Sequence, residues 1–360
     1  MINRRKTMKS ILEQPIFFEK NRVWRVYTGG ALFATFFGDD SVDGYEPEEW
    51  VASSVRAINK ESKGEKEGVS CVKGTELYFD DLLKKYPKEM LGDREEFGVL
   101  IKLLDSAIRL PIQAHPDKEF SRKYFDSEYG KTESWIVLET RPGAALYFGF
   151  KDKITKEQFA KAVEASENDK NVMEPLLNRV DVQPGDVFLV PARMVHAIGQ
   201  GCLILEIQEP TDFTIQPEYW CGEYHLNEKE MYIGLDPDRA LDVFDYETCG
   251  EEAVLKGRCY PKIISQTDSC LTEELVGYED TPCFAVQRYT ITSGEQTLIH
   301  APAVYVVTEG EGTVMCNGQS NSVKKGDYFF LPYVAKEKTI LQADSKLQVV
   351  VCLPPDLQKK

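Results

Sequence analysis

The chain carries the same short pattern twice, and this repeat constrains its fold more than any other feature. Residues 185–196 read GDVFLVPARMVH and residues 326–337 read GDYFFLPYVAKE. Each copy has a Gly-Asp pair, a short apolar run and a proline five residues after the aspartate. A Gly-Asp pair is typical of a turn, and a short apolar run bounded by turn residues is typical of a β-strand. The repeat therefore predicts two related β units; the alternative is two unrelated hairpins that share the turn by chance.

The stretch before the second copy indicates how such a unit is built. Gly310 and Gly312 punctuate a strand-like run that begins at Tyr305, and Asn317-Gly318 is a strong signal for a two-residue hairpin. This order of strand, hairpin, strand, Gly-Asp turn, strand and proline resembles the double-stranded β-helix of the cupin superfamily. Because most of the chain consists of short β-branched and aromatic runs, we expect a mainly β fold with two cupin-type jelly-roll units.

Helical periodicity interrupts this β pattern in three stretches, which we interpret as insertions on a β scaffold: residues 76–90, 153–178 and 228–244. Asp236-Pro237 supplies a helix start inside the last stretch. The predicted organisation is a first cupin unit made of residues 1–75 and 101–227, a helical insertion at 76–100, a helical linker at 228–252, and a second cupin unit at 253–360.

Charge and cysteine usage limit the partners of the chain. It has 59 Asp and Glu against 43 Lys and Arg, a net charge of −16, which disfavours binding to nucleic acid or anionic lipid. No run approaches the roughly 18 apolar residues of a membrane span, and Glu13, Gln14 and Pro15 break the stretch where a signal peptide would be apolar. Nine cysteines without a CxxC pair are typical of reduced thiols. We expect a cytoplasmic monomer or homodimer that binds a small molecule.

The sequence has only four histidines, and two of them belong to a set of candidate metal ligands. Strand geometry places Gln113 and His115 on one face, because side chains alternate along a strand. Glu133 begins a second predicted strand, and His196 follows the first Gly-Asp repeat. One amide oxygen, two imidazoles and one carboxylate suit one Zn²⁺ ion, and would also suit Fe²⁺, Mn²⁺ or Co²⁺. The other two histidines, His225 and His300, lack such companions, so we expect them to be structural or exposed.

Three motifs, in this order, carry a specific resemblance: QAHPD at residues 113–117, GKTE at 130–133, and VHAIGQGCLILEIQ at 195–208. With them the chain resembles the type I phosphomannose isomerases, in their short bacterial form. The resemblance implies zinc bound by Gln113, His115, Glu133 and His196. It also implies interconversion of mannose 6-phosphate and fructose 6-phosphate, in which a proton moves between C1 and C2 through a cis-enediol.

The same resemblance suggests the remaining site residues. Lys102 and Lys131 align with two family lysines that line the site, so each is a candidate catalytic and substrate-binding cation. Glu206, in LEIQ, aligns with an acidic residue near the metal and is a candidate proton carrier. The alternative for these three residues is a solvated surface charge.

The chain departs from the family pattern at two positions that bear on the substrate. Pro111 stands where the family usually has a serine that contacts phosphate, and Gln216 stands at the catalytic-site position of a family arginine. An Arg-to-Gln change removes a permanent cation and a bidentate donor. Arg193, just before His196, is a candidate substrate-binding replacement.

These departures leave three other functions open: isomerisation of an unphosphorylated or otherwise different sugar, sugar binding without catalysis, and oxygenase chemistry at Fe²⁺ held by His115, Glu133 and His196. The additional ligand Gln113 and the isomerase motifs disfavour the oxygenase. In the second unit Glu337 stands at the position that His196 has in the first, which predicts a metal-free second unit.

Overall fold

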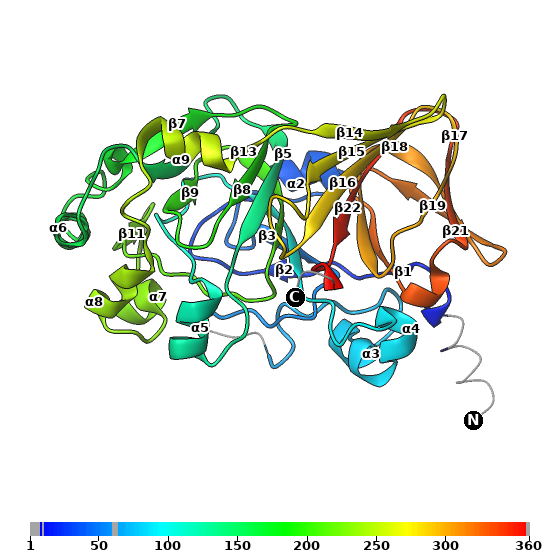
Figure 1. Cartoon of the computed structure of the whole chain (residues 1–360), viewed down its shortest axis with the longest axis horizontal. Coiled ribbons are helices and arrows are strands. Elements are labelled where there is room, and N and C mark those ends of the chain that lie inside the picture. The colour runs from blue at the N-terminus through cyan, green and yellow to red at the C-terminus, as the bar shows by residue number, and fades with distance from the viewer. Residues whose placement is uncertain (1–7, 9–10, 60–63, 358–360) are drawn as a thin grey trace.

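The computed structural model describes residues 8, 11–59 and 64–357. Two large antiparallel sheets pack face to face and dominate the molecule (Figure 1). The first has seven strands in the order β13-β8-β5-β10-β4-β3-β2. Its strands are β2 (Arg22–Val23), β3 (Glu48–Val51), β4 (Leu100–Asp105), β5 (Glu133–Thr140), β8 (Val187–Val190), β10 (Cys202–Gln208) and β13 (Arg258–Cys259).

The second sheet has ten strands, and its main path runs β1-β20-β18-β22-β16-β15-β14. Off this path, β19 and β21 pair with β18, and β17 pairs with β21. Its strands are β1 (Ile16–Phe17), β14 (Lys262–Gln266), β15 (Cys270–Val276), β16 (Ala285–Ile291), β17 (Gly294–Thr297), β18 (Ala303–Cys316), β19 (Gln319–Lys324), β20 (Tyr328–Leu331), β21 (Thr339–Ala343) and β22 (Leu347–Leu353). Since β1 comes from the N-terminal end of the chain, the second sheet combines both ends of the sequence.

Smaller elements complete the first unit. A three-stranded sheet contains β6 (Ala145–Phe150), β7 (Leu177–Asp181) and β9 (His196–Ile198), and β11 (Trp220–Cys221) pairs with β12 (Tyr224–His225). The helices are α2 (Ala31–Phe33), α3 (Phe79–Lys85), α4 (Pro87–Leu91), α5 (Lys118–Phe125), α6 (Lys156–Ser166), α7 (Glu228–Tyr232), α8 (Pro237–Ala240) and α9 (Gly250–Gly257), with short turns η1 (Ala34–Gly38), η2 (Glu174–Leu176), η3 (Leu241–Val243) and η4 (Tyr333–Ala335). Helices α6, α7 and α8 lie at the end of the molecule opposite β17, β19 and β21 (Figure 1).

Strand alternation divides the described interior into three large apolar clusters and a small fourth one made of Val23, Trp50 and Leu100. One face of the seven-stranded sheet, including Ile101 and Leu205, packs against Val304 and Phe330 of the ten-stranded sheet. The other face of the first sheet carries a separate cluster around Trp135 and Phe188, and the other face of the second sheet encloses a third around Tyr305 and Phe329, the interior of the jelly roll. A side-chain period of two explains why neighbouring residues of one strand enter different clusters. The mainly β prediction with helical insertions is confirmed.

The two copies of the repeat fold alike. Gly185 and Gly326 have φ values of 97° and 94°, in the left-handed region that glycine adopts without strain. Asp186 accepts a hydrogen bond from the backbone of Gln183 at 3.1 Å, and Asp327 accepts one from that of Lys324 at 2.8 Å. The strands β8 and β20 follow these turns. The predicted Asn317-Gly318 hairpin also forms, joining β18 to β19.

The helical stretches are shorter than their periodicity predicts. Residues 76–90 contain two helices that meet at Tyr86, where proline begins α4. The prediction of a helix over 153–178 is wrong beyond Ser166, because the chain there passes through η2 into strand β7. Asp236 does cap α8, accepting from the backbone of Arg239 at 3.0 Å with Pro237 in the first helical turn. The boundaries predicted above for the units stay a prediction.

Candidate metal centre and isomerase site

A row of polar and aromatic side chains crosses one face of the seven-stranded sheet. In the register, Trp50 of β3 lies opposite Lys102 of β4, Lys102 opposite Glu206 of β10, and Glu206 opposite Trp135 of β5. Residues directly opposite each other on adjacent strands share a face, so the four side chains are neighbours. Glu133 lies two residues before Trp135 and therefore faces the same way. All five side chains are buried.

Three of the four predicted metal ligands lie together next to this row. Glu133 Oε2 is 3.2 Å from His115 Nε2, and Glu133 Oε1 is 3.4 Å from His196 Nε2. One ligand atom from each residue lies within 4.8 Å of the others. Lys131 joins them: its ammonium contacts Glu133 Oε2 and lies 2.8 Å from His115 Nε2.

Hydrogen bonds to backbone carbonyls fix how both imidazoles face the cluster. His115 Nδ1 lies 2.9 Å from the carbonyl oxygen of Phe213, and His196 Nδ1 lies 2.8 Å from that of Met194. A carbonyl oxygen only accepts, so each Nδ1 carries the hydrogen and each neutral ring presents an Nε2 lone pair to Glu133. Such outward bonds are what orient metal-ligating histidines.

The protonation states support this arrangement. Burial lowers the pKa of His196 to about 3, and burial together with the nearby Lys131 charge lowers the pKa of His115. Burial would raise the pKa of Glu133, but the adjacent Lys131 charge outweighs it, and that pKa lies well below its usual value. Neutral imidazoles and an ionised carboxylate are the forms that bind a metal ion.

The donor set fits a cation. His196 Nε2 and Glu133 Oε1 are both acceptors, they face each other, and neither has a hydrogen-bond partner within the described residues. Two buried acceptors in contact are unfavourable unless a positive charge lies between or beside them. At present the Lys131 ammonium supplies that charge on the His115 side of the cluster. Two imidazole nitrogens and a carboxylate oxygen suit zinc or a related divalent metal.

The fourth predicted ligand, Gln113, is joined to His196 through the backbone. The two residues exchange both hydrogen bonds of an antiparallel bridge, each at 2.9 Å, so their side chains share a face. The strand predicted around Gln113 is reduced to this bridge and one at Ala114, because Pro111 and Pro116 lack the N–H needed to extend a ladder.

Lys102 and Glu206, two further predicted site residues, form a buried ion pair on the same sheet face as Glu133. Lys102 Nζ lies 3.4 Å from Glu206 Oε1 and 3.9 Å from carboxylate oxygens of Glu48 and Asp212. Within the described residues the Lys102 ammonium makes these ion pairs without donating a hydrogen bond. The indole N–H of Trp135 donates to Glu206 Oε2 at 3.2 Å. Burial and the charge of Glu133 raise the pKa of Glu206, as suits a proton carrier.

Sequence reasoning missed three residues that complete this charge network: Arg25, Glu48 and Asp212. Arg25 contacts Glu48 at 3.0 Å and Asp212 at 3.1 Å, and Glu48 also accepts from Trp50 at 2.7 Å. The one available signal was the run EEWV at residues 48–51, where alternation places Glu48 and Trp50 on one face. Arg25 and Asp212 lie in irregular segments far apart in sequence, which carry no such signal.

The structure places two of the predicted site residues in other surroundings. The Gln216 amide donates to the carbonyl oxygen of Glu230 at 3.0 Å, which fastens it to α7. The Arg193 guanidinium is half-exposed and contacts Asp117 at 3.5 Å and the Asp242 carbonyl at 3.1 Å, while its backbone N–H donates to His115 O at 2.7 Å. Arg193 therefore supports His115 through its backbone and directs its charge toward surface groups.

Pro111 is buried beside a different ion pair. The Arg109 guanidinium donates two hydrogen bonds to the Glu218 carboxylate, at 2.6 and 2.9 Å. Glu218 also accepts a hydrogen bond from the backbone N–H of Ile112 at 2.8 Å. The donors of Arg109 next to Pro111 are thus engaged within the protein. Of the two other histidines, His225 is exposed, and His300 contacts Gln287 at 3.0 Å.

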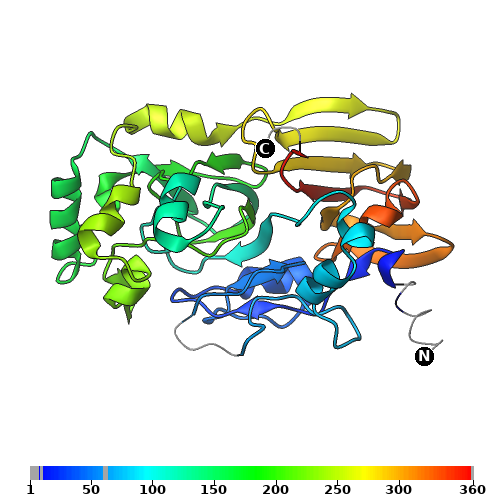
Figure 2. The same cartoon turned by 60° about the horizontal axis from the view of Figure 1, so that its bottom comes forward.

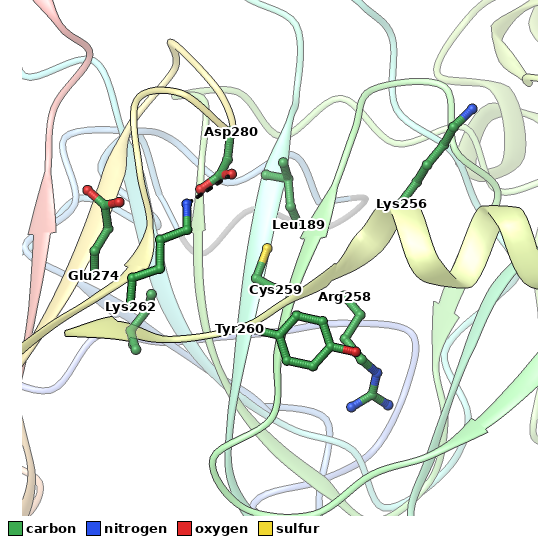
Figure 3. A pocket seen from close by; sticks show the side chains of 9 residues that line it. Leu189, Lys256, Arg258, Cys259, Tyr260, Lys262, Glu274 and Asp280 are labelled. Carbon is green, nitrogen blue, oxygen red and sulfur yellow. Dashed lines mark ion pairs between the residues drawn. The ribbon is translucent and has the colours of Figure 1, made fainter.

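A separate pocket of about 290 Å³ lies where β8 and β13 approach β14 and β15. Figure 3 shows Tyr260, Lys262 and Asp280 among its lining residues, with Lys262 and Asp280 3.9 Å apart. The metal-ligand candidates do not line it. Elsewhere, the nine cysteines are free thiols, and no helix between residues 11 and 357, apart from the undescribed residues 60–63, is long and apolar enough to span a membrane.

Comparison with known proteins identifies the family and agrees with the fold. Residues 276–352 match the family described as the mannose-6-phosphate isomerase cupin domain, so the cupin prediction is confirmed. The mannose-6-phosphate isomerase ManA of Bacillus subtilis is 30% identical over 247 residues, which cover 68% of this chain and 71% of that protein. The mannose-6-phosphate isomerase of Streptococcus mutans is 27% identical over 94% of this chain and 98% of that protein.

A solved structure shares the whole fold. The crystal structure of the mannose 6-phosphate isomerase from Bacillus subtilis superposes with a TM-score of 0.73 at 23% identity, covering 94% of this chain and 99% of that one. The match to ManA covers more than two-thirds of both chains at 30% identity. This chain belongs to the mannose-6-phosphate isomerase family.

Proposed function

We propose that this protein is a metal-dependent aldose–ketose isomerase that interconverts mannose 6-phosphate and fructose 6-phosphate. The proposal rests on one observation: the side chains of His115, Glu133 and His196 form a buried cluster beside the Lys102–Glu206 ion pair. The relatives named as mannose-6-phosphate isomerases support the same reaction. Gln113 is the proposed fourth ligand, because it shares a face with His196.

The residues divide the chemistry between them. A divalent ion held by Gln113, His115, Glu133 and His196 would supply a Lewis acid for the developing oxyanion. Glu206 carries the proton between C1 and C2 of the open-chain sugar, and its raised pKa favours both accepting and returning a proton. Lys102 offers a cation to the enediolate oxygen from within a buried site, where electrostatic stabilisation is strong.

A second candidate function is isomerisation of an unphosphorylated sugar. Two observations favour it: Pro111 offers no hydroxyl, and the Gln216 amide is engaged by Glu230 rather than replacing an arginine charge. Arg193 directs its guanidinium to Asp117, which weakens its case as the phosphate ligand. Lys131 remains the candidate cation for a phosphate.

The test is proton NMR in D₂O with the metal-loaded protein and a panel of free and phosphorylated hexoses. Deuterium entering C1 or C2 of mannose 6-phosphate supports the first proposal, and exchange confined to free aldoses supports the second. Binding of a sugar with neither aldose–ketose interconversion nor deuterium exchange would indicate a non-catalytic sugar-binding protein and overturn both. Chelation followed by Zn²⁺, Fe²⁺, Mn²⁺ or Co²⁺ identifies the activating metal.

A further inference from the structure

The second Gly-Asp turn docks on the first sheet. Lys325 forms an ion pair with Glu139 of β5. Gly326 packs so closely on η1 that a Cβ there would lie 2.7 Å from the Phe36 carbonyl oxygen. Tyr328, directly after the turn, donates a hydrogen bond of 2.6 Å to Glu49 of β3. One turn of the second unit thus contacts three separate elements of the unit that holds the candidate site.

The Tyr328 contact reaches a fully buried carboxylate. Glu49 is 0% exposed, and its Oε1 accepts from both Tyr328 and the backbone of Asn21, the latter at 2.8 Å. Arg22 Nε lies 2.8 Å from Oε2. A buried carboxylate is stable only when such partners compensate its desolvation. The Tyr328 hydroxyl is the partner that comes from the other sheet.

Glu49 stands between two residues of the site. Its neighbours Glu48 and Trp50 face the opposite side of β3, where Glu48 contacts Lys102 at 3.9 Å and Trp50 lies opposite Lys102. Strand β3 has only four residues, and its outer neighbour β2 has two. All four residues of β3 pair with β4, whereas only two pair with β2, so the bond from Tyr328 adds a contact from the other sheet to a strand whose outer pairing is short.

We infer that Tyr328 is a positioning residue of the isomerase site: through Glu49 it fixes β3, and with it the Glu48–Trp50 support of Lys102. The inference rests on the proposed function. This positioning role gives the second unit a part in the reaction. The second copy of the repeat presents Tyr328 to the seven-stranded sheet, whereas the first copy has Val187 at the equivalent position.

The test compares Tyr328→Phe with Tyr305→Phe in the full-length, metal-loaded protein. Tyr305 is a matched control, because it is buried in the same unit and donates to the His300 carbonyl at 2.8 Å, a bond that stays inside that unit. We expect Tyr328→Phe to lower kcat roughly tenfold with a smaller change in KM and unchanged metal content, since small misplacements of catalytic groups reduce rates steeply. Tyr305→Phe should leave kcat within about twofold, since its bond does not reach β3.

Hydrogen exchange by mass spectrometry provides a readout that does not depend on activity. Tyr328→Phe should speed amide exchange in residues 48–51, and Tyr305→Phe should not. Equal effects of the two variants on kcat, or unchanged exchange in β3 of Tyr328→Phe, would overturn the inference. If the wild-type protein turns over no sugar, the proposed function fails. The amide exchange of Tyr328→Phe still tests the positioning of β3 in that case. Unchanged exchange in β3 would overturn the role of Tyr328, and faster exchange confined to β3 would support it.

Discussion

The two Gly-Asp turns have matching backbones and different surroundings. In both, a glycine in the left-handed region precedes an aspartate that accepts from the backbone three residues earlier. After the proline that both copies share, the two segments differ: His196 is buried and begins β9, whereas Glu337 is exposed. The turn therefore determines where a strand begins, and the residues after the proline determine whether a buried histidine or an exposed glutamate stands at the equivalent position.

The interiors of the two units differ in the same way. Buried carboxylates in the first unit are compensated by buried ammonium groups: Lys102 pairs with Glu206, and Lys131 pairs with Glu133. The jelly-roll interior of the second unit is filled by apolar and aromatic groups such as Tyr305, Phe329 and Val351. Buried charges cost desolvation energy that apolar packing does not, so the interior of the first unit depends on ion pairing and that of the second on apolar packing.

The largest effect is expected from substitutions at His196 and Glu337, the equivalent positions that follow the prolines of the two repeat copies. His196→Ala should abolish metal binding and lower kcat/KM by about 10⁴-fold, because the metal supplies several kcal/mol of transition-state stabilisation. Glu337→Ala, in the second unit, should leave both unchanged. Metal content by mass spectrometry and steady-state kinetics measure this. Full metal occupancy in His196→Ala would contradict the proposed ligand set.

The next prediction compares a buried charged residue of the first unit, Glu206, with a buried apolar residue of the second unit, Leu341. Glu206→Gln preserves shape but removes the proton carrier, so kcat should fall by about 10³-fold, within the usual contribution of general acid–base catalysis. Leu341→Val should cost about 1 kcal/mol of unfolding free energy and leave kcat unchanged. A Glu206→Gln enzyme with a wild-type kcat would remove Glu206 from the mechanism.

Acid should weaken the first unit through Glu48. Burial would raise the pKa of Glu48, but Arg25, Lys102 and hydrogen bonds from Trp50 and Tyr27 lower it to about 2 from 4.5. Because the folded-state pKa is the lower one, its stabilisation is present above pH 4.5 and is lost as the pH falls toward 2. This amounts to roughly 2 to 4 kcal/mol.

Denaturant unfolding at pH 7, 5 and 3 tests the Glu48 prediction. Glu48→Gln should lower stability at pH 7 and flatten the decline below pH 5, because the substituted amide does not titrate. The same decline in Glu48→Gln and wild type would show that other carboxylates cause it.

The smallest expected effect distinguishes the two turns themselves. Gly185→Ala should cost about 1 kcal/mol, the strain of a side chain at positive φ. Gly326→Ala should cost more, roughly 2 to 3 kcal/mol, because its Cβ would also meet η1, whereas the space at Gly185 is open. Thermal unfolding of both variants measures the difference. Equal losses would indicate that the second turn is not docked.

Several features were predictable because they depend on near neighbours in sequence. The Asn317-Gly318 hairpin and the Asp236 cap follow from turn and capping chemistry within a few residues. The helix predicted through residue 178 failed, since its apolar spacing also suits the strand β7, and only pairing with β6 decided between them.

The candidate site was predictable in part for the same reason. The motifs around His115, Glu133 and His196 named residue types that bind metals, and the fold brought these three together. The position of Arg193 just before His196 made it a candidate replacement for the missing cation, yet its side chain contacts Asp117, and that contact depends on which surface groups lie nearby. The roles assigned to Lys102, Lys131, Glu206 and Gln216 stay predictions.

The sequence by itself determined the local geometry: two like turns, the strands that follow them, and the donor types of a metal site, because turn conformation and strand alternation act over a few residues. Only the tertiary structure decided that Arg25, Glu48 and Asp212 surround Lys102, and that Tyr328 reaches Glu49 across 279 residues. Those contacts depend on how two sheets stack, and the burial that makes them strong exists only after the sheets have packed.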